Sequence, residues 1–86
     1  MPAYEVLLSR AARKQLAILP LFIHNEIVEE ISLLSSRPRP AGCKKLKGFK
    51  NAWRIRIGSY RIIYEIEDKL LRILVIAIGN RKDVYE

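Results

Sequence analysis

The sequence is poor in cysteine and histidine and contains no long apolar run. Its single cysteine, Cys43, excludes an internal disulfide and a zinc site built from thiolates. A chain without disulfides suits a reducing compartment. The longest apolar runs, at 16–23 and 73–78, are too short to span a bilayer, and the N-terminus lacks a basic segment followed by an apolar one. We therefore expect a cytoplasmic protein without a membrane segment.

Several kinds of catalytic site are also missing. The only histidine, His24, lies in a segment of helical periodicity, so RNA cleavage by a pair of histidines is excluded. A metal-dependent nuclease needs clustered carboxylates, whereas the acids of the C-terminal half are scattered. The phosphate-binding pattern G-x-x-x-x-G-K-[ST] does not occur. We expect neither a metal nor a cofactor.

What the sequence does have is an uneven positive charge. With 86 residues, half of them apolar, it fits one domain covering residues 1–86. Of its formal charge of +7, residues 1–36 contribute three basic and four acidic side chains, and residues 37–86 contribute thirteen basic and five acidic ones. A basic half on a nearly neutral half is typical of a polyanion-binding face on a structural support. The alternative is a basic surface that serves solubility alone.

The N-terminal half has the pattern of a strand followed by two helices. Strand formers at 4–8 precede Ser9, which is a favourable helix N-cap. Apolar residues then recur at helical spacing as far as Leu19, and again from about Pro20 to Leu34. The second helix has an apolar stripe at Ile23, Ile27, Ile31 and Leu34.

The C-terminal half has the pattern of strands. The proline-rich segment 35–42 is a connector, and after it the apolar period changes to two. We expect strands at Trp53–Ile57, Tyr60–Ile66 and Leu70–Ile78. The order βααβββ predicts an α+β fold in which a helical hairpin packs on one face of an antiparallel sheet.

The turn at Gly58-Ser59 sets the register of the first two of these strands. A two-residue loop that begins with glycine fits a type II′ turn, which places Arg56 directly opposite Arg61. Arg54 lies two residues along on the same face, opposite the apolar side. Like charges facing each other destabilise a sheet, but a phosphate between two guanidinium groups would accept charge-assisted hydrogen bonds from both.

A simpler interpretation is that these arginines extend into water, or that Glu65 and Asp83 screen them. The next turn, Asp68-Lys69, would set Glu65 opposite Arg72 as an ordinary structural pair. Residues 79–86 then leave the sheet at a Gly-Asn turn signal.

The C-terminal segment adds Arg81, Lys82 and Tyr85. Tyr85 either stacks on a nucleobase, or acts as an acid or base on a hydroxyl, or folds back onto the sheet as an apolar plug. The reaction left by these exclusions is attack of an RNA 2′-hydroxyl on the adjacent phosphate, with cations stabilising the developing charge. Arginine carries protons poorly, so acid–base catalysis would fall to Tyr85 or to a lysine of depressed pKa, such as Lys45 or Lys47.

Residues 53–64, W-R-I-R-I-G-S-Y-R-I-I-Y, and 79–85, G-N-R-K-D-V-Y, resemble the RelE branch of the RelE/ParE toxin superfamily, as does K-K-L-K-G at 44–48. The resemblance implies a toxin of a toxin–antitoxin pair that enters the ribosomal A site and cleaves messenger RNA there. It also implies that Arg61 and Arg81 clamp the scissile phosphate and that Tyr85 orients the nucleotide or moves a proton. Arg54 and Arg56 stand where some members carry lysines, so no lysine acid is expected on this strand.

The resemblance implies partners as well. These are the ribosome with its message, and an acidic RelB-like antitoxin whose helical segment covers the basic face in a hetero-oligomeric complex. The residues expected to bind RNA or the ribosome are Lys44, Lys45, Lys47, Lys50 and Lys82. Two alternatives remain open: a ParE-like toxin that inhibits DNA gyrase, and a non-catalytic nucleic-acid-binding module.

Overall fold

The chain folds as two helices and a five-stranded sheet, with the element order that the sequence predicts plus one short extra strand. The computed structural model describes residues 3–80. The elements are β1 (Glu5–Leu8), α1 (Arg10–Ala17), α2 (Leu21–Leu33), β2 (Lys44–Lys45), β3 (Ala52–Ile57), β4 (Tyr60–Glu67), the 3-10 turn η1 (Asp68–Leu70) and β5 (Arg72–Asn80).

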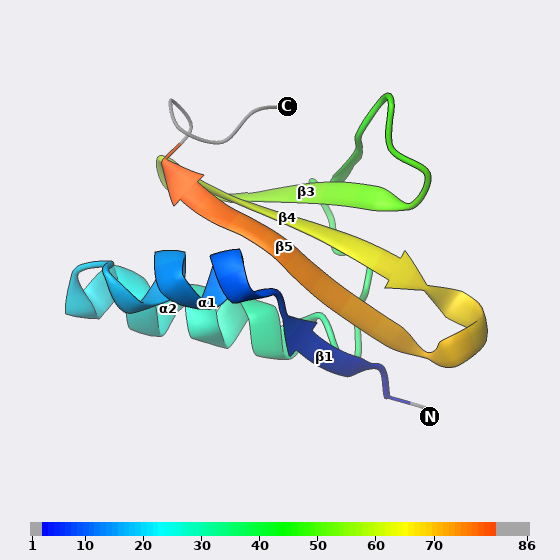
Figure 1. Ribbon diagram of the computed structural model, residues 1–86, viewed down its shortest axis with the longest axis horizontal. Helices are drawn as coiled ribbons and strands as arrows, with labels where there is room; N and C mark the ends of the chain where they lie inside the picture. The colour runs from blue at the N-terminus through cyan, green and yellow to red at the C-terminus, as the bar shows by residue number, and fades with distance from the viewer. Residues whose placement is uncertain (1–2, 81–86) are drawn as a thin grey trace.

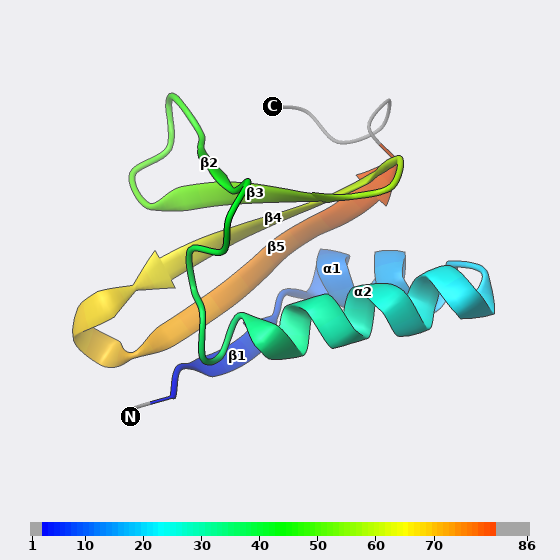
Figure 2. The same ribbon diagram turned by 180° about the vertical axis from the view of Figure 1, so that it is seen from behind.

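The sheet has the strand order β1-β5-β4-β3-β2 (Figures 1 and 2). The pairs β2–β3, β3–β4 and β4–β5 are antiparallel, whereas β1 pairs with β5 in parallel. The sheet is therefore mixed, and the expectation of a wholly antiparallel sheet is wrong in this one pair. A parallel pair needs a long connection between its strands. Here both helices and the other three strands intervene between β1 and β5.

Both helices cover the same face of the sheet, as the two opposite views show (Figures 1 and 2). Ser9 caps α1 as predicted, because its Oγ accepts a hydrogen bond from the Ala12 N–H at 3.0 Å. Pro20 is the N-cap residue of α2. Within residues 3–80, neither helix has the length and apolar composition to cross a membrane.

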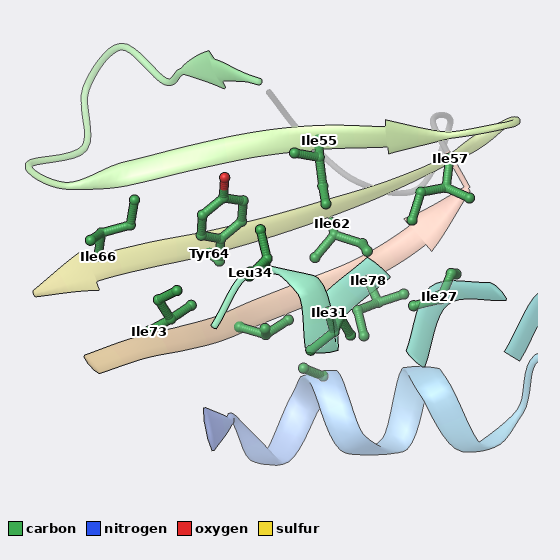
Figure 3. Close-up of a cluster of buried hydrophobic side chains, with 12 residues drawn as sticks. Ile27, Ile31, Leu34, Ile55, Ile57, Ile62, Tyr64, Ile66, Ile73 and Ile78 are labelled. Carbon is green, nitrogen blue, oxygen red and sulfur yellow. The ribbon is translucent and has the colours of Figure 1, made fainter. Parts of the chain in front are cut away.

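The main core lies between α2 and the sheet (Figure 3). The predicted stripe is confirmed, since Ile27, Ile31 and Leu34 are buried and Ile23 packs against them. Burying an isoleucine or leucine stabilises the fold by about 1.5–3 kcal/mol. The sheet residues of this cluster are Ile55, Ile57, Ile62, Tyr64, Ile66, Ile73, Val75 and Ile78.

A second, smaller apolar cluster lies on the other face of the sheet, which we call the open face, beside a β-bulge in β5. Ile63 pairs with Ala77 and Tyr64 pairs with Val75, so Ile76 is an extra residue on β5. The second cluster consists of Leu46, Ala52 and Ile63, with Ile76 and Ala77 packed against them. The open face is therefore partly apolar beside β2.

β1 pairs only with the first part of β5, and the edge of β5 that follows is covered by α1 and its N-cap. The Ser9 N–H donates to the Val75 carbonyl at 2.8 Å, and the Ser9 hydroxyl donates to the Ile76 carbonyl at 3.1 Å. The Ile78 N–H donates to Gln15 Oε1 at 2.7 Å. These bonds satisfy backbone groups of β5 that β1 is too short to reach.

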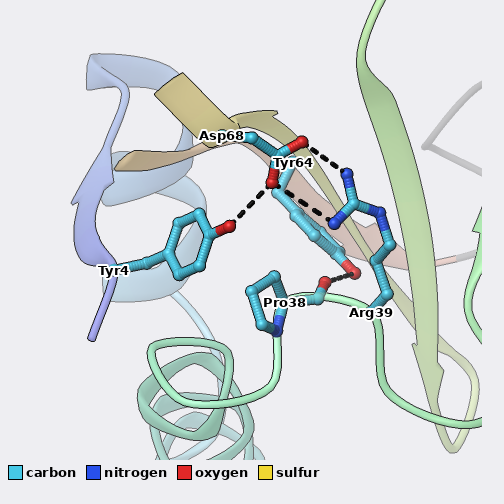
Figure 4. A network of polar contacts seen from close by, with 5 residues as sticks. All are labelled: Tyr4, Pro38, Arg39, Tyr64 and Asp68. Carbon is cyan, nitrogen blue, oxygen red and sulfur yellow. Dashed lines mark hydrogen bonds and ion pairs between the residues drawn. The ribbon is translucent and has the colours of Figure 1, made fainter. Parts of the chain in front are cut away.

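The proline-rich connector is fastened to the sheet by a polar network (Figure 4). Arg39 forms an ion pair with Asp68 at 2.9 Å and lies 4.9 Å from the centre of the Trp53 ring. The Tyr4 hydroxyl donates to Asp68 at 2.7 Å. These hydrogen bonds, from Arg39 first and Tyr4 second, lower the pKa of Asp68.

Tyr64, from inside the core, forms a second hydrogen bond that holds the connector against the sheet. Its hydroxyl donates to the Pro38 carbonyl at 2.8 Å. Burial raises the pKa of the Tyr64 phenol well above its usual value.

Two sequence-based expectations about turns are wrong. The connection between β4 and β5 is longer than Asp68-Lys69 and ends at Leu71, which has φ +50, so Arg72 faces Glu67 and Glu65 faces Leu74. Gly79 and Asn80 do not form a turn but continue β5, where backbone pairing with Tyr60 and Arg61 holds them. Ladder pairing has overridden the local turn preference of the Gly-Asn dipeptide.

Candidate nucleic-acid interface

The hairpin of β3 and β4 places Arg56 directly opposite Arg61, as predicted. Gly58 has φ +60 while Ser59 is not among the residues of positive φ, which is the backbone pattern of a type II′ turn. This turn fixes the whole register, including the Trp53–Tyr64 pair. Because Ile55 and Ile62 point into the core, the alternation of side chains puts Arg56 and Arg61 on the open face.

Arg56 is exposed and Arg61 is half-buried. Arg61 has Arg56 as its partner on one side and Gly79 on the other, so no side chain flanks it at that level of β5. A glycine beside a cation on a sheet leaves room for close approach of a ligand. Gly79 thus adds no side chain beside Arg61 in the β5 ladder.

Arg54 is buried, so it does not fit the simpler interpretation that the arginines extend into water. It lies on the same face but is only 2% exposed, and its Nε and that of Arg61 are buried. Burial in the first place, and repulsion from Arg56 in the second, lower the pKa of Arg54. The Arg54 side chain is therefore not extended into solvent.

The lysines at 44–50 that were expected to bind RNA lie in three places. Lys44 is the cross-strand partner of Arg54 and so lies on the open face, whereas Lys45 pairs with Trp53 and faces the helix side. Both are exposed. Lys47 and Lys50 are exposed on the segment between β2 and β3. The structure thus brings Lys44 to the arginines and separates Lys45 from them.

Three site residues of the sequence analysis, Arg81, Lys82 and Tyr85, lie outside the described residues, as does Asp83. β5 ends at Asn80, opposite Tyr60 and beside the hairpin turn. Glu65 shares the open face with Arg61 but lies four positions further along β4, about 13 Å away. Glu65 is therefore not a cross-strand neighbour of the Arg56–Arg61 pair.

Phe49 was not among the expected site residues. It is 44% exposed and stands between Lys47 and Lys50 in the segment connecting β2 and β3. The sequence signal that could have identified it is an aromatic residue within a run of lysines, directly after a glycine.

The described part of the site can bind and stabilise negative charge. Arg56 and Arg61 offer planar hydrogen-bond donors that suit phosphate oxygens. The charge of the buried Arg54 adds to the positive electrostatic potential at this site. Guanidinium groups do not release protons at neutral pH, so a reaction that moves protons would need a further group.

The chain is similar to known toxins over nearly its whole length. Residues 6–85 match the family described as "ParE toxin of type II toxin-antitoxin system, parDE". Toxin RelG of Mycobacterium tuberculosis is 29% identical over 83 residues, which cover 95% of this chain and 95% of RelG.

Solved structures agree with this match. A chain of the RelBE2 toxin–antitoxin complex from Mycobacterium tuberculosis superposes with a TM-score of 0.81 and 28% identity, covering 92% of this chain and 99% of that one. A chain of the archaeal RelE–RelB complex from Pyrococcus horikoshii gives a TM-score of 0.83 and 26% identity, covering 95% and 99%. With the family match spanning almost all of its residues, this chain belongs to the ParE toxin family of the RelE/ParE superfamily and is a toxin of a type II toxin–antitoxin system.

Proposed function

We propose that this toxin is a ribosome-dependent, metal-independent endoribonuclease that cuts messenger RNA in the A site. The observation that carries the proposal is the cross-strand pair of Arg56 and Arg61 on the open face, with the buried charge of Arg54 beside it. Like charges at this spacing repel each other, and an anion bound between them would accept charge-assisted hydrogen bonds from both. A phosphate of the message is such an anion.

In this proposal the RNA 2′-hydroxyl attacks the adjacent phosphorus, and the bond to the leaving 5′-oxygen breaks. Arg61 and Arg81 bind the scissile phosphate, and Arg56 and Arg54 stabilise the charge that develops on its oxygens. Tyr85 orients the nucleotide or moves a proton. Lys44, Lys45, Lys47, Lys50 and Lys82 contact RNA and the ribosome through the phosphate backbone.

We propose an acidic, RelB-like antitoxin as the protein partner. Among the similar solved structures are two toxin–antitoxin complexes, RelBE2 of Mycobacterium tuberculosis and RelE–RelB of Pyrococcus horikoshii. The formal charge of +7 favours an acidic segment, and its helix would cover the basic open face. Covering Arg56 and Arg61 would block access of a phosphate to the site.

Inhibition of DNA gyrase is the second candidate, because the family description that matches this chain names ParE. The two functions make opposite predictions for RNA. A nuclease cuts ribosome-bound message and leaves supercoiling intact, whereas a gyrase inhibitor does the reverse. A non-catalytic nucleic-acid-binding module would do neither and would not arrest growth.

The deciding experiment maps cuts on message in an in vitro translation reaction and measures supercoiling by gyrase in parallel. Arg61→Ala and Arg56→Ala are each expected to slow cutting by about 10²–10³-fold, the effect of removing one stabiliser of transition-state charge. Arg13→Ala is the matched control, because Arg13 is an exposed arginine of α1 on the helix side. Intact message together with blocked supercoiling would overturn the proposal.

A further inference from the structure

The segment between β2 and β3, which we call the lysine loop (residues 47–51), combines exposed cations with an exposed aromatic ring. Lys47 and Lys50 flank Phe49, and all five loop residues are exposed. Residues 44–50 contain four lysines and no acid. Cations that alternate with an aromatic ring are typical of surfaces that bind single-stranded nucleic acid, since lysines contact phosphates and the ring stacks on a base.

Both ends of the lysine loop are held, so Phe49 is not needed for packing. Leu46 is 7% exposed and Ala52 is fully buried, and the two residues pack together in the second cluster. The Leu46 N–H donates to the Ala52 carbonyl at 2.9 Å, which closes the loop at its base. Phe49 belongs to neither apolar cluster. Gly48, with φ +84, lets the chain turn directly before it.

The loop stands on the same side of the sheet as the arginines. Figures 1 and 2 show the segment between β2 and β3 rising from the sheet on the side away from the helices. Along β3, Ala52 at the base of the loop and Arg56 are four residues apart, or about 13 Å. One RNA strand can therefore contact Arg56 and the loop together.

We infer that the lysine loop is a second RNA contact, in which Phe49 stacks on an unpaired base while Lys47 and Lys50 bind the phosphates on either side of it. The inference rests on the proposed function for its substrate class. An exposed Phe49 alone would be unremarkable, because single apolar side chains are common on protein surfaces. The flanking lysines, the independent anchoring of the loop and its position beside the arginines point to a nucleotide as the occupant.

The test measures binding without cleavage. Fluorescence anisotropy follows a labelled 2′-O-methyl RNA, which has no free 2′-hydroxyl to attack, as a single strand and as a duplex. Phe49→Ala is expected to weaken single-strand binding about tenfold, the effect of losing one stacked base, and to leave duplex binding unchanged. Phe49→Trp should restore it. The control is Leu70→Ala, because Leu70 is 60% exposed on η1, between the far ends of β4 and β5.

A second binding measurement, with ribosomes in place of free RNA, identifies which RNA supplies the stacked base. If Phe49→Ala weakens binding to programmed ribosomes only, the base belongs to the message; if it weakens binding to vacant ribosomes equally, the base belongs to ribosomal RNA. Both results support the inference. Wild-type affinity of Phe49→Ala for RNA and ribosomes, or a loss of affinity only for a poly-glutamate peptide, would overturn it, as would a wild-type protein that binds neither RNA nor ribosomes.

The binding and cutting experiments fail independently. If Arg61→Ala abolishes cutting while Phe49→Ala binds normally, the inference about the loop is wrong and the proposed function stands. If no message is cut but binding depends on Phe49, the proposed function is wrong and the loop contact stands.

Discussion

Arg56 and Arg61 face each other across the β3–β4 hairpin, held there by backbone register and not by any attraction between their side chains. The glycine turn at 58–59 fixes the register, and the buried residues Ile55 and Ile62 prevent it from slipping by one. The repulsion also extends to Arg54, whose pKa is lowered by Arg56 after the effect of its own burial. We therefore expect these facing like charges to lower the stability of the free protein.

This relationship predicts that Arg56→Gln stabilises the free protein while it impairs function. Removing one of two facing like charges should raise the free energy of unfolding by about 0.2–1 kcal/mol. Denaturation with urea at low and at high salt measures the change, and salt should reduce it because the pair is partly exposed. A destabilised variant would show that the arginines are not repelling each other.

Gly58→Ala should destabilise the hairpin by about 1 kcal/mol, because φ +60 is unfavourable for a residue with a Cβ. Nothing lies within 4 Å of the position that the new Cβ would occupy, so the cost is conformational and not a clash. Thermal denaturation measures it. Ser59→Ala at the neighbouring position is the control and should change little.

The ion pair between Arg39 and Asp68 predicts an acid-sensitive contribution to stability. The pKa of Asp68 is lowered from its ordinary value of 3.8, so its contribution is complete above that value and is lost as the pH falls through the lower, folded-state pKa. Asp68→Asn should therefore lower the Tm at neutral pH, and the difference from wild type should shrink below about pH 4. A difference that is constant with pH would mean that the carboxylate charge contributes nothing.

Tyr64→Phe should cost about 1 kcal/mol of stability, because it removes the hydroxyl that donates to the Pro38 carbonyl while keeping the buried ring. Chemical denaturation measures the loss. Tyr60→Phe is the matched control, since Tyr60 is half-buried and none of the side-chain hydrogen bonds of the described part of the chain involves its hydroxyl. Equal losses in the two variants would argue against a specific role for the Pro38 contact.

Ser9→Ala should destabilise the protein by about 0.5–2 kcal/mol, the usual cost of losing a helix N-cap. The Ser9 hydroxyl accepts from Ala12 and also donates to the Ile76 carbonyl, so the loss should lie at the upper end. Ser9→Asp separates the two roles, because aspartate caps the helix but cannot donate to Ile76. Its stability should fall between those of wild type and Ser9→Ala.

Local sequence signals were sufficient where one interaction decides the conformation. Ser9 as a helix cap, the α2 stripe from Ile23 to Leu34 and the Gly58 turn could all be predicted, because each depends on residues close in sequence. The arginine pair followed from the turn alone. Expectations failed where distant segments decide, as at Gly79 and Asn80, which pair with β4 in place of turning.

By itself, then, the sequence determined the order of helices and strands, the register of the β3–β4 hairpin and the face on which Arg56 and Arg61 lie, because capping, apolar period and turn geometry act over a few residues. Only the tertiary structure decided that β1 is parallel to β5, that β5 has a bulge at Ile76, and that Arg54 is buried while Phe49 is exposed. These features depend on which strands and loops meet in space, and the burial of a side chain is set by neighbours that local sequence does not specify.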